Sequence, residues 1–402
     1  MNGRTANDPA GFWNRDFILA FCAYFGLYIS MTMFYIYPLY FQRYGTAQGR
    51  IGLIMGVHSL LAILVRPLFG RVIDARGGRR IALAGILFFI AVLPFFHLVR
   101  DAGWLPFVLR AATGMAWGVS ITATMVLCAD LAPAGRLAQS IGVIGVAGIV
   151  GSAVGPWLGE EIIRRFGFGM LFNAAIVFLV AAFVCILGTR RMGCPAAAEA
   201  GVKAGPLKGI PFGVLAIVSL MPIFHGAIRG SIVNFIALFA KDAGLGRVGP
   251  FFAVFSIAAI LTRLVAGDLS DRFGRKTVIW PAAGIIGLNL FWISQVRSYP
   301  MFLVNGFIAG LGQGLIFPAL STYLVDTVGM AHKAFALSLY MSLFDTGAGL
   351  GSPLFGGLAD AWGYRNMYIA AGCLLLLSTV IFLFKAPKSA GPASPVSLPA
   401  DP

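Results

Sequence analysis

Long apolar stretches alternate with short polar segments along almost the whole chain. Each stretch has about 20 residues, the length that an α-helix with a rise of 1.5 Å per residue needs to cross the hydrocarbon of a bilayer. The pattern therefore predicts an all-α membrane protein with twelve transmembrane helices. The predicted helices cover residues 17–37, 49–69, 81–99, 104–128, 137–159, 168–189, 211–240, 249–268, 277–295, 301–325, 334–357 and 366–385.

The two halves of the chain repeat one another. The segment GRVIDARGGRR at residues 70–80 returns 197 residues later as GDLSDRFGRKT at residues 267–277, and the same offset places Arg66 on Arg263. Near the middle of each half the offset is one residue shorter, so that Gly114 corresponds to Gly310 and Asp130 to Asp326. Parallel duplicated halves in an apolar chain are typical of secondary transporters. We therefore expect two bundles of six helices each.

The polar segments set the predicted domain boundaries. Residues 191–210 are basic and interrupted by Pro and Gly, as a linker between the halves would be. The end of the chain is rich in Pro, Ser and Ala and has no periodic apolar pattern, which is typical of disorder. The predicted parts are a cytoplasmic N-terminus (1–16), an N-terminal six-helix bundle (17–190), a cytoplasmic linker (191–210), a C-terminal six-helix bundle (211–385) and a disordered cytoplasmic tail (386–402).

Composition and charge agree with a membrane location. Hydrophobic residues make up 59% of the chain and charged residues 11%, which lies outside the range of soluble domains. The net charge of +15 indicates topology rather than nucleic-acid binding, because the side that holds both termini in the predicted arrangement carries roughly twice as many Lys and Arg as the other side. We expect a monomeric, multi-pass protein of the plasma (inner) membrane, with cytoplasmic termini and an uncleaved first helix.

The sequence predicts no metal site, no cofactor and no enzymatic activity. The five cysteines have no paired spacing, and no nucleophile, base and orienting group share a plausible arrangement. The expected partners are a small-molecule substrate, protons and the lipid bilayer.

The repeated loop carries a specific signature, G-x-x-x-D-x-x-G followed by basic residues. Its members are Gly70, Asp74, Gly77, Arg79 and Arg80 in the first copy, and Gly267, Asp271, Gly274, Arg275 and Lys276 in the second. Through this signature the chain resembles the major facilitator superfamily over nearly its whole length, and within it the twelve-helix efflux permeases. The resemblance implies that the loop is a cytoplasmic gating latch that favours the outward-open state.

Further latch residues follow from the same resemblance. Arg76 and Arg272 lie within the two loops, and Asp130 and Asp326, at the ends of the fourth and tenth predicted helices, are expected partners for the loop arginines. The alternative is that these charges only direct membrane insertion.

Arg110 lies more than one turn inside the fourth predicted helix and is followed by Gly114 and Gly118. Arginine within the bilayer costs about 2.5–3.5 kcal/mol on insertion scales, so its side chain should face an aqueous cavity or a partner. The resemblance implies a role in proton movement. A purely structural link to polar groups is equally open.

The fifth predicted helix carries a pattern that resembles the antiporter motif of drug-exporting family members. Its residues are Gly142, Gly151, Gly155, Pro156 and Gly159, and Glu160 stands where the family has a final glycine. The spacing of four stacks the last three glycines on one helix face, where they permit close helix contact. The pattern favours export, although the related segment GSPLFGG at residues 351–357 is also consistent with ancestral duplication.

Asp345 is the carboxylate nearest the middle of a predicted helix and is the first choice for proton coupling. The alternative is a permanently ionised carboxylate that pairs with a buried cation. The other coupling candidates are Arg110, His225 and Arg229, because the first helix lacks the acidic residue that is common in similar proton-coupled exporters. The i, i+4 spacing places His225 and Arg229 on one helix face.

Several polar and aromatic side chains are candidates to line a substrate cavity. They are His58, Tyr28, Tyr35, Trp117, Phe224 and Asn234. The alternatives are that His58 makes a structural hydrogen bond and that the aromatic rings pack helices or face lipid.

The leading hypothesis is a secondary transporter that exports small amphipathic molecules in exchange for protons by rocking its two halves. A second is an importer or facilitator of organic anions or other metabolites, favoured by Arg110 and Arg229. A third is a membrane sensor or assembly partner that keeps the fold but has lost transport.

Overall fold

The computed structural model describes residues 14–131, 137–190, 212–266, 269–328 and 333–387. Every regular element in these ranges is helical, and no strand occurs among them. Ten of the helices are long and apolar enough to cross a membrane. The all-α prediction is therefore confirmed for the described residues, whereas the predicted linker, the N-terminal segment up to residue 13 and the tail from residue 388 lie outside them.

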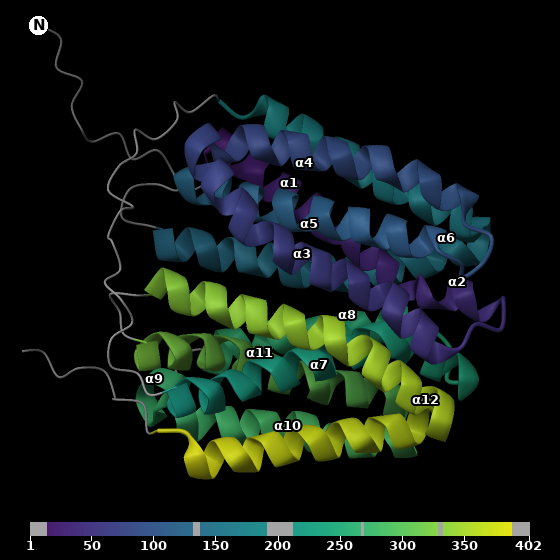
Figure 1. Cartoon of the computed structure of the whole chain (residues 1–402), viewed down its shortest axis with the longest axis vertical. Helices are drawn as coiled ribbons and strands as arrows, with labels where there is room; N and C mark the ends of the chain where they lie inside the picture. Colours follow the sequence, from purple (N-terminus) through teal and green to yellow (C-terminus); the bar gives the residue numbers. More distant parts are fainter. Residues whose placement is uncertain (1–13, 132–136, 191–211, 267–268, 329–332, 388–402) are drawn as a thin grey trace, which may run out of the picture. The chain divides into compact units, whose positions relative to one another are not determined.

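The chain forms two compact units, and unit 1 comprises Met1–Ala200 together with Arg247–Ala253. Its helices are α1 (Arg15–Thr32), η1 (Met33–Ile36), α2 (Pro38–Gln42), α3 (Gln48–Arg76), α4 (Gly78–Val92), η2 (Leu93–Leu98), α5 (Leu105–Asp130) and α6 (Leu137–Gly188). Within this unit α1 packs along α6, and α5 packs against both α3 and α4 (Figure 1).

Unit 2 comprises Gly201–Gly246 and Val254–Pro402. The remaining helices of the chain are α7 (Phe212–Asp242), α8 (Gly249–Ala266), α9 (Leu269–Phe273), α10 (Arg275–Gln295), α11 (Tyr299–Val328) and α12 (Lys333–Lys385). In unit 2, α7 packs along α12, and α10 packs against α11 and α12 (Figure 1).

Two pairs of predicted helices are joined in the structure. The stretches 137–159 and 168–189 form α6, and 334–357 and 366–385 form α12. Each long helix is interrupted by one residue outside helical geometry, Gly167 at φ 81° and Gly363 at φ 78°. Glycine adopts positive φ without a Cβ clash, so one residue is enough to redirect the chain, and each pair of predicted helices meets at a kink.

Glycines let the helices of unit 1 meet backbone to backbone. A Cβ added at Gly114 of α5 would lie 2.2 Å from the carbonyl oxygen of His58 on α3. At the crossing of α6 and α1, a Cβ at Gly155 would lie 2.8 Å from the Ile29 carbonyl oxygen, and the Thr32 hydroxyl donates to the Gly151 carbonyl at 2.9 Å. Such close approach gains dispersion contacts where no hydrophobic effect drives helices together.

Unit 2 repeats both crossings. A Cβ added at Gly310 of α11 would lie 2.1 Å from the carbonyl oxygen of Phe255 on α8, which corresponds to Gly114 and His58 in unit 1. One added at Gly226 of α7 would lie 1.8 Å from the Phe344 carbonyl oxygen on α12. The duplication in the sequence is therefore also a duplication of helix contacts.

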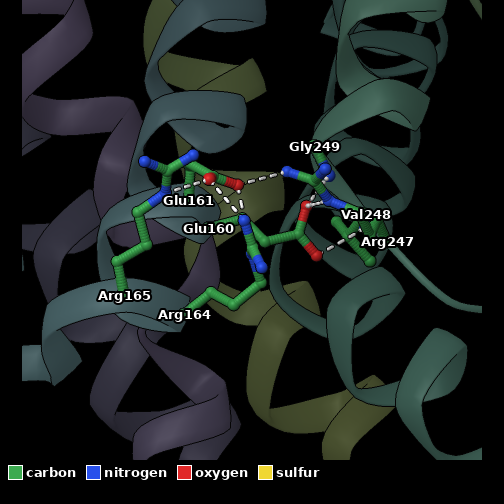
Figure 2. Close-up of polar contacts among 7 residues, drawn as sticks. All are labelled: Glu160, Glu161, Arg164, Arg165, Arg247, Val248 and Gly249. Carbon is green, nitrogen blue, oxygen red and sulfur yellow. Dashed lines mark hydrogen bonds and ion pairs between the residues drawn. The ribbon is translucent and has the colours of Figure 1, made fainter.

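A cluster of charged residues explains why the start of α8 groups with unit 1 (Figure 2). Glu160 on α6 accepts hydrogen bonds from the backbone N–H groups of Val248 at 2.9 Å and Gly249 at 2.6 Å. These groups belong to the N-terminal end of α8, where N–H groups have no partner within the helix and attract negative charge. Glu161 pairs with Arg247 at 2.7 Å. We call these five residues the α8 clamp.

The α8 clamp depends on a departure from the repeat. Arg247 and Gly249 correspond to Arg50 and Gly52 in the first half, but Gly357 stands where Glu160 would be repeated. Arg50 donates instead to the backbone carbonyl of Ala102. A Cβ at Gly249 would lie 2.7 Å from Trp157 Cα, so the close approach also needs this glycine.

We expect Gly114→Ala to lower the free energy of unfolding by about 1–3 kcal/mol, because the new methyl group meets the α3 backbone and no flexible side chain can move aside. The measurement is denaturant unfolding of the purified protein in detergent. Gly142→Ala is the matched control, since nothing lies within 4 Å of a Cβ there and alanine favours the helix. An equal loss in both variants would contradict the packing argument.

We expect Glu160→Gln to speed amide hydrogen exchange at Val248 and Gly249, because the neutral side chain is a weaker acceptor for the end of α8. Hydrogen–deuterium exchange with mass spectrometry measures this change. Glu161→Gln is the control, since Glu161 accepts from arginine side chains and not from these amides. Unchanged exchange in Glu160→Gln would show that the carboxylate does not hold the start of α8.

Candidate functional site

Unit 1 brings two of the predicted site residues together where α5 crosses α3. Arg110 and His58 are both buried, at 3% and 2% exposure. His58 Nδ1 lies 3.3 Å from Thr113 Oγ1, and the Thr113 hydroxyl donates to the Arg110 carbonyl at 3.1 Å. The guanidinium carbon of Arg110 lies 5.7 Å from the centroid of the Phe34 ring. The α5–α3 crossing thus holds an arginine and a histidine in an apolar surrounding.

Aromatic candidates continue along α5. Trp117 and Tyr28 form an edge-to-face pair with ring centroids 5.1 Å apart, and Tyr28 also lies 5.1 Å from Tyr24. Tyr35, in η1, instead contacts Phe252 at 5.6 Å. Tyr28 and Trp117 are therefore neighbours, whereas Tyr35 belongs to a different contact.

In unit 2, His225 connects three helices. Its Nε2 lies 2.8 Å from Gln313 Oε1 on α11, and its ring lies 5.1 Å from that of Phe344 on α12. His225 is 1% exposed. Its preceding residue, Phe224, is half-buried on α7.

The other polar candidates of α7 contact different helices. The guanidinium carbon of Arg229 lies 5.2 Å from the centroid of Phe255 on α8. Asn234 Nδ2 donates to Ser352 Oγ on α12 at 2.7 Å. The polar candidates of α7 therefore contact three different helices and do not share one set of neighbours.

Asp345 lies in the middle of the first part of α12 and is half-buried. The other carboxylates on the described residues lie in loops, in end turns or within about two turns of a helix kink. Tyr340, which is completely buried, lies within electrostatic range of both Asp345 and Arg263. Asp345 therefore has a buried phenol as a polar neighbour within an apolar helix.

Two basic residues of the repeated loop fasten the last helix of each unit. Arg79 donates to the Leu187 carbonyl at 2.9 Å and to Thr189 Oγ1 at 3.2 Å, at the end of α6. Lys276, the repeat of Arg79, donates to the Ala386 carbonyl at 2.6 Å, just after α12. A cation near a helix C-terminus satisfies carbonyl groups that have no partner within the helix.

The second loop also holds an ion pair. Arg275 Nε lies 3.3 Å from Asp326 Oδ2, with both side chains about one-fifth exposed. The equivalent position in unit 1 is Gly78, where a Cβ would lie 2.9 Å from the Ala123 carbonyl oxygen. The arginine of this ion pair is therefore not duplicated. Asp130 is the last residue of α5.

The remaining latch residues give less information. Arg76, Arg80 and Arg272 are exposed, and nothing lies within 4 Å of a Cβ added at Gly70. Gly267 lies outside the described residues, as do the side chains of Asp74 and Asp271. The gating role of the loop stays a prediction.

The antiporter-like motif forms the face of α6 that meets α1. Added Cβ atoms would lie 2.7 Å from Tyr28 Cβ at Gly151 and 3.4 Å from the Met33 carbonyl at Gly159. Pro156 lies within the helix, whereas nothing lies within 4 Å at Gly142. The motif is a packing surface, and its link with export stays a prediction.

Sequence reasoning missed Gln313 and the α8 clamp. Gln313 is an isolated amide in the apolar stretch 301–325, and this isolation is a signal that a polar contact lies there. Its partner His225 is 88 residues away in the sequence. No local pattern identifies such a partner.

Comparison with known proteins identifies the family. The family model of the Major Facilitator Superfamily matches residues 17–246 and 218–399. The multidrug resistance protein MdtG of Escherichia coli O81 (strain ED1a) is 25% identical over 394 residues, which cover 93% of this chain and 95% of MdtG.

Two solved structures share the fold. The nucleoside transporter NupG superposes with a TM-score of 0.76 at 15% identity, over 93% of this chain and 99% of NupG. The human organic anion transporter MFSD10 superposes with a TM-score of 0.66 at 17% identity, over 91% of this chain and 98% of MFSD10. The matched residues span nearly all of the chain, so the resemblance expected from the repeated loop is confirmed. The protein is a multi-pass membrane transporter of small molecules that belongs to the Major Facilitator Superfamily.

Proposed function

We propose that the protein exports small amphipathic molecules in exchange for protons. The observation that carries this proposal is the similarity to a multidrug resistance protein over almost the full length of both chains. The glycine face of α6, which resembles the antiporter motif, supports the same direction of transport.

Twelve membrane crossings in two six-helix bundles are part of this proposal. α6 has 52 residues and α12 has 53. A straight helix of that length would be about 80 Å long, more than twice the thickness of the bilayer hydrocarbon. Division at Gly167 and Gly363 turns each into two spans. We place both termini in the cytoplasm and the monomeric protein in the plasma (inner) membrane, following the distribution of Lys and Arg.

Asp345 is the proposed proton carrier. A half-buried carboxylate in an apolar helix is costly to keep ionised unless a cation or water compensates for it. Tyr340 lies within electrostatic range of Asp345, so a change of protonation at Asp345 alters the charge next to this buried phenol. His225 and Arg229 on α7 are the accompanying coupling residues, and Arg110 is the candidate in unit 1.

The latch in this proposal rests on Arg275 and Asp326. An ion pair with both side chains partly exposed contributes modestly, so it is weak enough to form in one conformation and break in another. Arg79 and Lys276 hold helix ends and are assigned to the permanent structure instead.

We expect Asp345→Asn to abolish transport driven by an imposed pH gradient while transport down a substrate gradient persists, because the amide cannot carry a proton. Proteoliposomes loaded with cationic, neutral or anionic compounds test this expectation. Asp360→Asn is the matched control, since Asp360 is an exposed carboxylate of the same helix near its kink. Full gradient dependence in Asp345→Asn would refute the assignment.

The second candidate function is an importer or facilitator of organic anions or other metabolites. Arg229, a cation in the middle of α7 over the ring of Phe255, is the observation that favours it. This function predicts electrogenic uptake of a labelled carboxylate that Arg229→Ala abolishes and that Arg297→Ala, at an exposed arginine, leaves intact. The absence of uptake in the wild type would exclude it.

A further inference from the structure

The side chain of Arg110 stands out among the charged groups of unit 1. It is only 3% exposed, and its Nε has no hydrogen-bond partner in the structure. The Phe34 ring at 5.7 Å provides a cation–π contact, which offsets only part of the cost of a buried guanidinium. A buried cation in a native protein normally has a hydrogen-bonded negative partner.

In the described part of unit 1, no carboxylate lies at the position of Arg110 along the helices. Asp16 and Asp130 lie at helix ends, Asp101 lies in the loop before α5, and Glu160 and Glu161 are engaged in the α8 clamp. Asp74 lies in the last turn of α3. The negative charge that balances Arg110 therefore has to come from outside this set.

The repeat shows that the helix crossing does not need Arg110. Unit 2 makes the same backbone contact between α11 and α8, at Gly310 and Phe255, with Gly306 at the position of Arg110. Phe255 occupies the position of His58. Because Gly306 and Phe255 are enough for helix packing in unit 2, Arg110 and His58 have a role other than packing in unit 1.

Other unsatisfied polar atoms lie near Arg110. Tyr37 is completely buried, its hydroxyl has no partner, and its ring lies 5.5 Å from Phe34 and within electrostatic range of Arg110. His58 Nε2 is also buried without a partner. A guanidinium and a phenol both donate hydrogen bonds. A group that accepts from both, such as a carboxylate or sulfonate, completes this set.

An aromatic surface continues from the same helix face. Trp117 follows Arg110 by two turns, which is about 10 Å along α5. Its ring forms the edge-to-face pair with Tyr28. A ligand with an anionic group at Arg110 and an aromatic body directed toward Trp117 fits the order of these side chains.

We propose that Arg110, with Tyr37 and the Trp117–Tyr28 pair, binds an amphipathic organic anion through its negatively charged group and its aromatic body. This proposal rests on the proposed transport function, because it names the chemical class of a molecule that the protein carries. It does not depend on the direction of transport or on proton coupling.

Equilibrium binding tests the proposal without any gradient. The purified full-length protein is placed in nanodiscs of phosphatidylcholine, and the probe is radiolabelled naphthoate, with naphthylmethanol and naphthylmethylammonium as neutral and cationic competitors of the same shape. We expect naphthoate to bind and neither competitor to displace it. Displacement of naphthoate by either naphthylmethanol or naphthylmethylammonium at equal concentration would overturn the proposal.

Arg110→Gln should weaken naphthoate binding by about tenfold or more, which is the scale of a lost charge-assisted hydrogen bond. Arg100→Gln is the matched control, because Arg100 is an exposed arginine just before α5. Trp117→Leu should weaken binding while the anion selectivity remains. Unchanged naphthoate affinity in Arg110→Gln would overturn the proposal.

The melting temperature distinguishes a binding role of Arg110 from a structural role. In the absence of ligand, Arg110→Gln should melt at the temperature of the wild type or above it, because it removes a buried charge whose Nε has no hydrogen-bond partner. It should also lose the thermal stabilisation that naphthoate gives to the wild type. A large drop in melting temperature without ligand would show that Arg110 holds the fold, and would overturn the proposal.

The lipid is the other possible source of an anion, and nanodiscs that contain phosphatidylglycerol test it. Displacement of naphthoate by this lipid would assign the site to a headgroup and overturn its role in transport. Failure of the proposed export would appear differently, as an absence of gradient-driven transport with naphthoate binding intact.

Discussion

Direct backbone contact between paired helices is the constraint on which the rest of the structure depends. In a bilayer the hydrophobic effect does not drive helices together, so close packing and hydrogen bonds must hold them. Gly114 against His58 and Gly155 against Ile29 provide that contact in unit 1, and Gly310 and Gly226 provide it in unit 2. These contacts fix where every polar side chain on the crossing helices can point.

Local chemistry makes most of the scaffold predictable. A helix satisfies its own backbone hydrogen bonds, so an apolar stretch of sufficient length is enough to predict one. The positions of Gly151, Gly155 and Gly159 indicated a packing face, and that face meets α1. The two parts of α6 and of α12 were predicted as separate helices, but the sequence did not show that a single glycine at positive φ makes each turn between them.

The candidate site is less predictable for a geometric reason. Which residues lie within a helix follows from composition, but what they touch depends on the angles at which helices cross. His225 and Arg229 do share a face of α7, yet one contacts Gln313 on α11 and the other lies over Phe255 on α8. Glu160 was recognised as a departure from the family pattern, but its partners lie 88 and 89 residues away.

Comparison of the two copies separates residues that support the shared fold from residues that the shared fold does not need. A contact present in both units is needed for the common architecture, as are the helix-end contacts of Arg79 and Lys276. A feature present in one copy cannot be required by that architecture, because the other copy folds without it. Arg110, His58, Glu160, Arg275 and Asp345 are all of this second kind, and their repeats are Gly306, Phe255, Gly357, Gly78 and Gly148. Most of these equivalent residues are glycine. The residues with a proposed role in binding, coupling or gating therefore stand largely at positions where the shared fold does not need a side chain.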